Sequence, residues 1–382
     1  PGMPDLAPLL TPERHELAEL VCELHSQASP WVPSGMGNHL HWGPQPQTQS
    51  SVVSLRHHNQ VMEHSTGDFT VTVEAGMALS ELQAVLAEQE QWLPIDPPLA
   101  GSSSIGGVVA RGVSGPMRHK AMGLKDQVIG ISLLRSDGTT AQAGGQVVKN
   151  VAGYDLMRLL TGSWGSLALI TQLTLRTQPL PNHRQCFEVT GSLPSLQQLR
   201  QDLLLRSPLA LERLEWTHQA GVISLWLSLV SLNPEGLQQQ QEQLRASLGR
   251  ELSLQSVDWE PSSQMIEKEA WLLRLGIEPQ RADALLGQTA IKPWALQLGA
   301  ASGLGLASGQ AANHQVAALR QQCESLGGYL TVLQAPQGQE IQAWSDAPAR
   351  AIIEAVKRQF DPLQQLSRGR LPGVAPIQPI RA

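Results

Sequence analysis

Residues 146–180 read QVVKNVAGYDLMRLLTGSWGSLALITQLTLRTQPL, and this stretch decides the predicted fold. It starts as a short apolar strand, turns at Gly153 and continues as a predicted helix from Tyr154 to Leu160. A second turn at Gly165 leads into a strand whose alternate residues share one face, namely Leu169, Thr171, Leu173 and Leu175. Glycines at the ends of so many elements let the backbone approach a flat ligand closely, although tight turns in an α+β domain would also account for them.

The composition excludes several classes of protein. A chain of 382 residues is long enough for about two or three domains. Charged residues make up only 16% and the formal net charge is −6, which argues against a nucleic-acid-binding surface. The cysteines Cys22, Cys186 and Cys323 are scattered and odd in number. A disulfide framework is therefore excluded, and a reducing, intracellular setting is expected.

No stretch of the sequence is predicted to cross a membrane. A spanning helix needs roughly 20 apolar residues, and the most apolar run, residues 222–232, alternates apolar and polar side chains as a sheet strand does. The first residues also lack the basic and apolar pattern of a signal peptide. We therefore expect any membrane attachment to go through a partner.

The first half of the chain predicts a mixture of strands and helices. Thr11-Pro12 is a typical helix start, because a hydroxyl cap precedes a proline at the first helical position. An apolar stripe follows it at Leu17, Leu20, Val21 and Leu24. Further elements are predicted as strands at 31–32, 52–55 and 70–76, a helix carrying Leu79, Leu82, Val85 and Leu86, and a hairpin from Val128 through a turn at Asp137-Gly138 to Ala143.

The second half reads as a separate α+β unit. Residues 177–182 form a predicted linker, because two prolines interrupt any continuing element. Beyond it we expect an antiparallel sheet with helices on one face. The predicted strands are 185–190 and 222–232, the predicted helices are 194–205 and 234–248, and the glycine-dense residues 299–309 are assigned to a strand and turn.

The opening stretch resembles the flavin-binding domain of vanillyl-alcohol-oxidase-type (PCMH-type) flavoproteins. Within that group it is most similar to the FAD-binding E subunits of bacterial glycolate oxidases, nearly residue for residue at 147–156 and 161–171. The resemblance extends with gaps from about Trp31 to Pro181. It implies an α+β fold with a two-lobed PCMH-type FAD-binding domain at 1–181, its lobes at about 1–50 and 51–181. A smaller α+β cap domain with an antiparallel sheet is expected at 182–382.

The resemblance also implies one FAD, held by the main chain of glycine-rich loops. The loop at 33–40, here the first loop, would hold the diphosphate. A Rossmann fingerprint is excluded because Leu40 stands where the third glycine would be. His39 is out of register with the histidine that binds flavin covalently in some relatives, so non-covalent FAD is expected. The implied cofactor residues are Pro33, Ser34, Gly35, Met36, Gly37, Asn38, His39, Leu40, Ser102, Ser103, Ser104, Ile105, Gly106, Gly107, Ser114, Gly115, Leu169, Ile170 and Thr171.

Catalytic residues are harder to find. Catalytic relatives carry a histidine cluster, often with a metal, in their second half. After Pro181 this chain has only His183, His218 and His314, none at metal-ligand spacing, so no metal site is expected. Arg118 and His119 are weak candidates for facing the flavin, and a solvated basic loop is the alternative. Residues 360–362 and 368–373 resemble the closing segment of FAD-linked oxidases and are expected to seal a domain interface.

The resemblance implies a subunit of a complex that oxidises glycolate or a related small 2-hydroxy acid. The implied partners are a catalytic flavin subunit and an iron–sulfur subunit, because this chain has too few cysteines for a cluster of its own. The complex would be cytoplasmic and peripheral to a membrane. Two alternatives remain open: a flavin-free scaffold subunit, and a free-standing FAD-dependent hydroxy-acid dehydrogenase. Tryptophans of the second half are candidates for the interface, with core packing as the alternative, namely Trp216, Trp226, Trp259, Trp271, Trp294 and Trp344.

Overall fold

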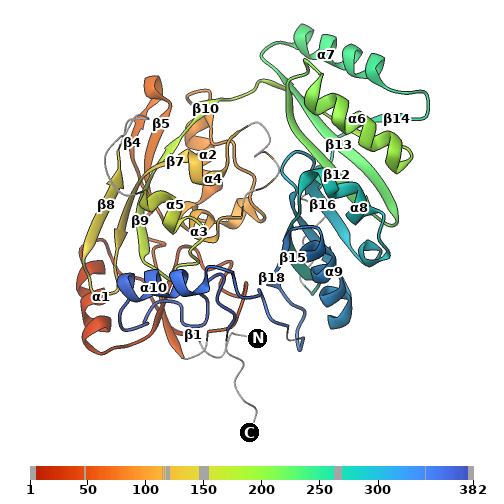
Figure 1. Ribbon diagram of the computed structural model, residues 1–382. Coiled ribbons are helices and arrows are strands. Elements are labelled where there is room, and N and C mark those ends of the chain that lie inside the picture. Colours follow the sequence, from red (N-terminus) through yellow and green to blue (C-terminus); the bar gives the residue numbers. More distant parts are fainter. Residues whose placement is uncertain are drawn as a thin grey trace. The chain divides into compact units, whose positions relative to one another are not determined.

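The chain folds into two compact units. In a computed structural model, the residues described are 6–46, 49–113, 115, 117, 121–145, 155–261, 269–339 and 341–376. Unit 1 comprises residues 1–114, 123–180 and 342–382, and unit 2 comprises 115–122 and 181–341 (Figure 1). The chain therefore returns to the first unit after completing the second. This differs from the expected cap at 182–382, and the reason is that Val356, Phe360 and Leu371 pack against the core of unit 1.

A small parallel sheet carries the first loop. Its strand order is β1 (Leu6–Leu10), β3 (Ser50–Ser54), β2 (Trp31–Ser34), and both pairings are parallel. Since β3 runs to Ser54, this sheet extends past the expected lobe limit at residue 50. Helix α1 (Leu17–Ser26) buries Leu17, Val21 and Leu24 as the stripe predicts. It does not begin at Pro12, because residues 14–16 form a turn in which Arg14 pairs with Glu74.

The core of unit 1 lies on a five-stranded antiparallel sheet. The strand order is β4 (Val61–Ser65), β5 (Thr70–Glu74), β9 (Leu169–Arg176), β7 (Val128–Leu134), β8 (Thr140–Gly144). The hairpin of β7 and β8 and the strand β9 are confirmed, although burial along β9 does not alternate strictly because Leu169 and Ile170 are both buried. Leu173 of β9 is paired to both Val73 and Ile131. These three side chains are buried in one apolar cluster. The fold class is α+β, as the resemblance implies.

Short helices complete unit 1 and hold its loops. In α3 (Ile105–Arg111), the Ser104 side chain caps the helix by accepting from the N–H of Gly107. The predicted helix at 154–160 is α5 (Leu156–Leu160), capped by Asp155; Tyr154 lies outside the described residues, as do 146–153. The remaining elements are α2 (Leu79–Ala87), β6 (Gln91–Trp92), α4 (Leu124–Gln127), β10 (Gln178–Pro179), α10 (Arg350–Phe360) and the 3₁₀ turns Thr66–Asp68 and Ala100–Ser102.

Unit 2 is built on an eight-stranded antiparallel sheet. The strand order is β14-β11-β13-β12-β16-β17-β15-β18, which agrees with the antiparallel sheet expected for the second half. Its strands are β11 (His183–Thr190), β12 (Leu211–Gln219), β13 (Val222–Ser231), β14 (Ser253–Val257), β15 (Trp271–Gly276), β16 (Ala295–Gly299), β17 (Leu304–Gly309) and β18 (Tyr329–Gln334). Its helices are α6 (Leu193–Leu205), α7 (Pro234–Ser247), α8 (Ala282–Leu286), α9 (Asn313–Ser325) and the 3₁₀ turns Pro279–Arg281 and Thr289–Ile291.

The tryptophans considered for an interface are mostly core residues. Trp216, Trp226, Trp271 and Trp294 are buried in unit 2, whereas Trp259 is half-buried. Trp344 belongs to unit 1 and is also buried. Core packing is therefore the reading that fits five of the six. Among the residues described, no helix combines the length and the apolar character needed to cross a bilayer.

Candidate functional site

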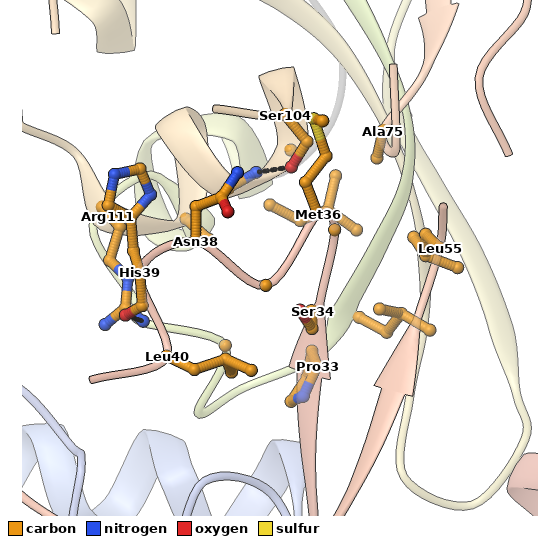
Figure 2. A pocket seen from close by; sticks show the side chains of 18 of the residues that line it. Pro33, Ser34, Met36, Asn38, His39, Leu40, Leu55, Ala75, Ser104 and Arg111 are labelled. Carbon is orange, nitrogen blue, oxygen red and sulfur yellow. Dashed lines mark hydrogen bonds between the residues drawn. The ribbon is translucent and has the colours of Figure 1, made fainter. Parts of the chain in front are cut away.

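A pocket in unit 1 brings together segments that are distant in the sequence. Its empty volume is about 660 Å³, which includes space open to solvent. Figure 2 shows His39 and Arg111 together on one side of it and Leu55 and Ala75 on the other. Of the predicted cofactor residues, those lining the pocket are Pro33, Ser34, Gly35, Met36, Gly37, Asn38, His39, Leu40, Ser102, Ser104, Gly106, Gly107, Leu169 and Ile170.

Other predicted residues lie elsewhere. Ser103, Ile105, Gly115 and Thr171 do not line the pocket: Ser103 and Ile105 are buried beside it, and Thr171 accepts a main-chain hydrogen bond from Ala75. Gly115 falls with unit 2. Ser114 and the weak catalytic candidates Arg118 and His119 lie outside the described residues. The pocket is also lined by residues that were not among the predicted cofactor residues, namely Leu55, Ala75, Ala110, Arg111, Trp164, Gly165 and Ala168.

The first loop follows β2, and the main-chain N–H groups of its residues 36–39 donate in none of the described hydrogen bonds. The Ser54 hydroxyl donates to the carbonyl of Gly35 at 2.7 Å, and Gly37 adopts a left-handed conformation at φ 83°. The N–H of Leu40 then closes the turn onto the carbonyl of Gly37 at 3.3 Å. Consecutive free N–H groups in such a turn form a nest for an anion.

Glycine is required where the first loop meets the second loop (102–107). A Cβ on Gly35 would stand 1.9 Å from Ser104 Oγ, a distance that no pair of non-bonded atoms tolerates. The Asn38 side-chain amide donates to the carbonyl of Ser102, so the two loops are also joined by a hydrogen bond. The loops therefore form a single wall of the pocket.

The N–H groups of the second loop are already occupied, which corrects part of the expectation. The resemblance implies that main-chain groups of this loop hold the cofactor, which would require free N–H groups at the start of α3. Instead, the N–H groups of Ile105 and Gly106 donate to the carbonyls of Met77 and Ala75 at 2.9 and 2.8 Å, and that of Gly107 donates to Ser104 Oγ at 3.2 Å. The second loop thus supplies close packing to the pocket rather than free main-chain donors.

The turn before β9 is attached to the end of α3. The N–H of Gly162 donates to Val109 at 3.0 Å and that of Trp164 donates to Ala110 at 2.8 Å. Trp164 has φ 57°, a left-handed conformation that is unfavourable for a bulky side chain. Its ring packs edge-on against Trp344, with centroids 5.2 Å apart. The surrounding contacts hold Trp164 in this conformation and place its ring at the pocket.

Arg111, at the end of α3, is a functional candidate that the sequence reasoning missed. Its Nη2 donates to the carbonyl of His39 at 2.8 Å, and its guanidinium carbon lies 4.1 Å from the centroid of the Trp164 ring. Its Nη1 is buried and has no hydrogen-bond partner among the described residues. Burial, together with the charge of Arg370, lowers the pKa of Arg111 well below its usual value. Arginine is common in the last turn of a helix, so the position of Arg111 in the sequence does not distinguish it from an ordinary surface charge.

His39 is neutral in this setting. Burial, then the charge of Arg111 and then that of His41, lower the pKa of His39 to about 4. Its ring packs against Trp42 with centroids 4.3 Å apart, and its Nε2 is buried without a hydrogen-bond partner in the described part of the chain. The expectation that His39 contacts the cofactor without bonding to it covalently stays a prediction.

Residues 367–370 of the C-terminal segment support the first loop through hydrogen bonds to main-chain carbonyls. Arg370 is buried, and its guanidinium donates to the carbonyls of Leu40, Trp42 and Pro44, the last two at 3.1 and 2.7 Å. The Ser367 hydroxyl donates to Gly165 at 3.1 Å. This segment was expected to seal an interface between domains. Its described contacts instead lie within unit 1, where it supports the pocket.

The same segment is anchored by a buried ion pair. Lys357 of α10 pairs with Asp361, and Lys357 Nζ also donates to the carbonyls of Ser166 and Leu366 at 2.6 and 2.8 Å. Asp361 accepts from the N–H of Leu366 at 2.7 Å. Because each charge has several partners, the pair is satisfied internally. Among the residues described, no cluster of three or more metal-ligating side chains occurs.

The chain is similar to a family of FAD-binding domains and to several known proteins. Residues 9–144 match a family model described as "FAD binding domain". The glycolate oxidase subunit GlcE of Escherichia coli (strain K12) is 33% identical over 166 residues, which are 43% of this chain and 47% of that protein. The glycolate oxidase subunit GlcD of Bacillus subtilis (strain 168) is 32% identical over 187 residues, covering 48% and 39%.

Two further comparisons define how far the likeness extends. A D-2-hydroxyglutarate dehydrogenase of Xanthomonas citri pv. viticola is 32% identical over 203 residues, covering 53% of this chain and 42% of that protein. The chain thus spans less than half the length of these curated relatives. A solved structure of alkyldihydroxyacetonephosphate synthase is similar with a TM-score of 0.69 at 14% identity, covering 94% of this chain and 75% of that one. At that identity the likeness concerns the fold alone.

Proposed function

We propose that this chain is the FAD-binding subunit of a multi-subunit oxidoreductase, because residues 9–144 match a family model described as "FAD binding domain". The complex oxidises glycolate or a related small 2-hydroxy acid to the 2-oxo acid. The matched regions of the glycolate oxidase subunits GlcE and GlcD support this assignment. The partners are a catalytic flavin subunit and an iron–sulfur subunit, and any contact with a membrane is made through them.

The single observation that carries the proposal is the fit of the pocket to FAD. The free N–H groups of residues 36–39 suit a diphosphate, and the apolar side chains of Leu55, Leu169 and Ile170 suit flat ring systems. Arg111, which is half-buried, lines the same pocket, and its Nη1 has no hydrogen-bond partner among the described residues. An apolar or cationic ligand would leave these donors unsatisfied.

Bound FAD would supply the capacity to accept the electrons released by substrate oxidation and to pass them to the partner subunits. The residues of this chain bind and orient the cofactor. The first loop holds its anionic part, and the tight packing of Gly35 on Ser104 excludes water between the two loops. His39, with its pKa near 4, is uncharged at neutral pH and adds no positive charge to the site.

Partner subunits are proposed to contribute the substrate chemistry. Oxidation of a hydroxy acid needs a base for the hydroxyl and cations for the carboxylate. After Pro181 the sequence has three histidines, and no His-x-x-His pair occurs anywhere in the chain. The iron–sulfur centre must also come from a partner, since three scattered cysteines do not form a cluster site.

The decisive measurement is the flavin content of the purified full chain. We expect yellow protein that releases about one FAD per chain on acid treatment, since the cofactor is held non-covalently. Colourless protein that shows no thermal shift with FAD would favour a flavin-free scaffold subunit instead. Flavin that stays with the acid-precipitated protein would contradict non-covalent binding.

A second assay tests the role in a complex. We expect glycolate-dependent dye reduction by the co-expressed complex and little or none by the isolated chain. Full turnover by the isolated chain would favour the free-standing dehydrogenase. Unchanged turnover after removal of this subunit from the complex would contradict the proposal altogether.

A further inference from the structure

Arg111 is a half-buried cation for which no carboxylate partner occurs among the residues that the structure describes. Its Nη1 is shielded from solvent and has no hydrogen-bond partner among the same residues. Within that part of the chain, the guanidinium makes one hydrogen bond, to the carbonyl of His39, and it rests on the Trp164 ring. A buried charge that is not paired carries a large desolvation cost, and natural proteins rarely keep one without a ligand or partner.

A second buried arginine increases this imbalance. Arg370 is buried and its hydrogen bonds go to main-chain carbonyls, which are neutral acceptors. Its charge is near enough to Arg111 to lower the pKa of that residue. In the described part of the chain, the nearby Lys357–Asp361 pair neutralises itself and adds no net charge. The region around the first loop therefore carries an excess of positive charge.

The free donors of the pocket point to the same chemistry. Among the described hydrogen bonds, none is donated by the main-chain N–H groups of residues 36–39, whereas those of residues 105–107 are occupied by protein acceptors. The first loop and the Arg111 side chain, which lines the pocket, thus hold the donors that protein acceptors in the described part of the chain leave unoccupied. Main-chain N–H groups and a guanidinium together are suited to an anion with several oxygens.

Resting on the proposed function, we infer that Arg111 is the counter-charge for the diphosphate of FAD bound at the first loop. The main-chain donors of residues 36–39 give the phosphate oxygens their hydrogen bonds, and Arg111 neutralises the charge. Trp164 keeps the guanidinium in position, which accounts for a tryptophan held at φ 57° beside the pocket. A carboxylate of the hydroxy acid has similar chemistry and is the competing source of the anion.

Binding measurements on the full chain test this inference. We compare the wild type with Arg111→Met, which removes the charge and keeps much of the side-chain length, and with Arg111→Lys, which keeps the charge. The probes are FAD and ADP, which carry a diphosphate, and riboflavin and adenosine, which do not. We expect Arg111→Met to weaken FAD and ADP binding about 10- to 100-fold, the range for one charge-assisted hydrogen bond, and to leave adenosine and riboflavin nearly unchanged. Arg111→Lys should lie between the two.

The stability of the cofactor-free chain gives a second readout of opposite sign. If Arg111 awaits an anion, its replacement by Met relieves an unpaired buried charge, so the melting temperature without FAD should stay the same or rise. A structural role on Trp164 and His39 predicts a fall instead. Arg56→Met, which removes an exposed arginine of the same unit, is the matched control and should change neither affinity nor stability.

The outcomes separate the inference from the proposed function. Wild-type chain that binds neither FAD nor ADP would contradict the proposed function and with it the inference. Wild-type binding of FAD with an unchanged Arg111→Met affinity for FAD and ADP overturns the inference alone. The same result combined with a raised KM for glycolate in the complex would assign Arg111 to the substrate carboxylate.

Discussion

Gly35 and Ser104 lie in direct contact: a Cβ added to Gly35 would stand 1.9 Å from Ser104 Oγ and 2.6 Å from Ser104 Cβ. Gly35 begins the turn of the first loop, and Ser104 caps α3 by accepting from Gly107. This van der Waals contact, together with the hydrogen bonds from Asn38 to Ser102 and from Arg111 to His39, sets the distance between the first loop and the helix that carries Arg111. The width of the pocket depends on the absence of one methyl group.

Gly35→Ala should widen this contact and disturb the pocket. Overpacking of this kind costs about 1–3 kcal/mol, so we expect a lower melting temperature and FAD binding weakened about tenfold or more. Isothermal titration and thermal unfolding measure the two effects. Combining it with Ser104→Gly should restore part of the affinity, since the clashing atoms are removed. Gly67→Ala is the control, because a Cβ there meets no atom within 4 Å; an equal effect at Gly67 would contradict the argument.

Replacing Arg370 should release the first loop from the C-terminal segment. Its guanidinium serves the carbonyls of Leu40, Trp42 and Pro44, and a lysine cannot reach them in the same fork. We expect stability and FAD affinity to fall in the order wild type, Arg370→Lys, Arg370→Met. The Met variant should lose about 3 kcal/mol or more, because buried carbonyls lose their donors. Denaturant unfolding measures this, with Arg368→Met as control; equal losses at both positions would argue against a specific role.

The stability of unit 1 should depend on pH through His39. Its pKa is about 4 in the folded chain and near 6.5 when unfolded, so the unfolded state binds the extra proton more readily. The contribution of neutral His39 is fully present above pH ~6.5 and is lost as pH falls toward ~4, by at most about 3 kcal/mol. His39→Phe should flatten the unfolding free energy between those pH values. A curve with the wild-type slope would mean that other groups cause it.

Lys357 and Asp361 should couple strongly in a double-mutant cycle. Removing one partner leaves the other charge buried, which costs about 3–5 kcal/mol, whereas Lys357→Met combined with Asp361→Asn leaves no such charge. We expect the double variant to be more stable than the sum of the single losses predicts, by about 1–3 kcal/mol. The pairs of Arg350 with Asp346 and Glu354 are exposed, and Arg350→Ala should change stability little. Additive losses at Lys357 and Asp361 would contradict the coupling.

Local pattern was enough to predict much of the fold. Strict alternation identified β9 and β13, and the Asp137-Gly138 turn identified the hairpin of β7 and β8. These signals are local, because side-chain period and turn chemistry depend only on neighbouring residues. The prediction that α1 begins at Pro12 was wrong, because the true start depends on a contact between distant residues. Arg14 pairs with Glu74, far away in the sequence, and no local rule registers that pair.

The site was predictable only where it consists of loops with a family likeness. Segments 33–40, 102–107 and 169–171 were named in advance, and most of their residues line the pocket. Arg111 and Trp164 were not, and the segment 368–373, which contains Arg370, was expected at a domain interface, because the roles of these residues arise from contacts across the fold. An arginine at a helix end reads as an ordinary solvated charge, and nothing local shows that Arg370 reaches Leu40.

The contact between Arg370 and Leu40 can form only late in the synthesis of these residues. The two residues are 330 positions apart, so the ribosome completes the first loop long before its support exists. At about 5–20 residues per second, the delay is roughly 15 to 70 s. During that time all of unit 2 emerges. The first loop thus acquires the support of Arg370 only after all of unit 2 has been synthesised.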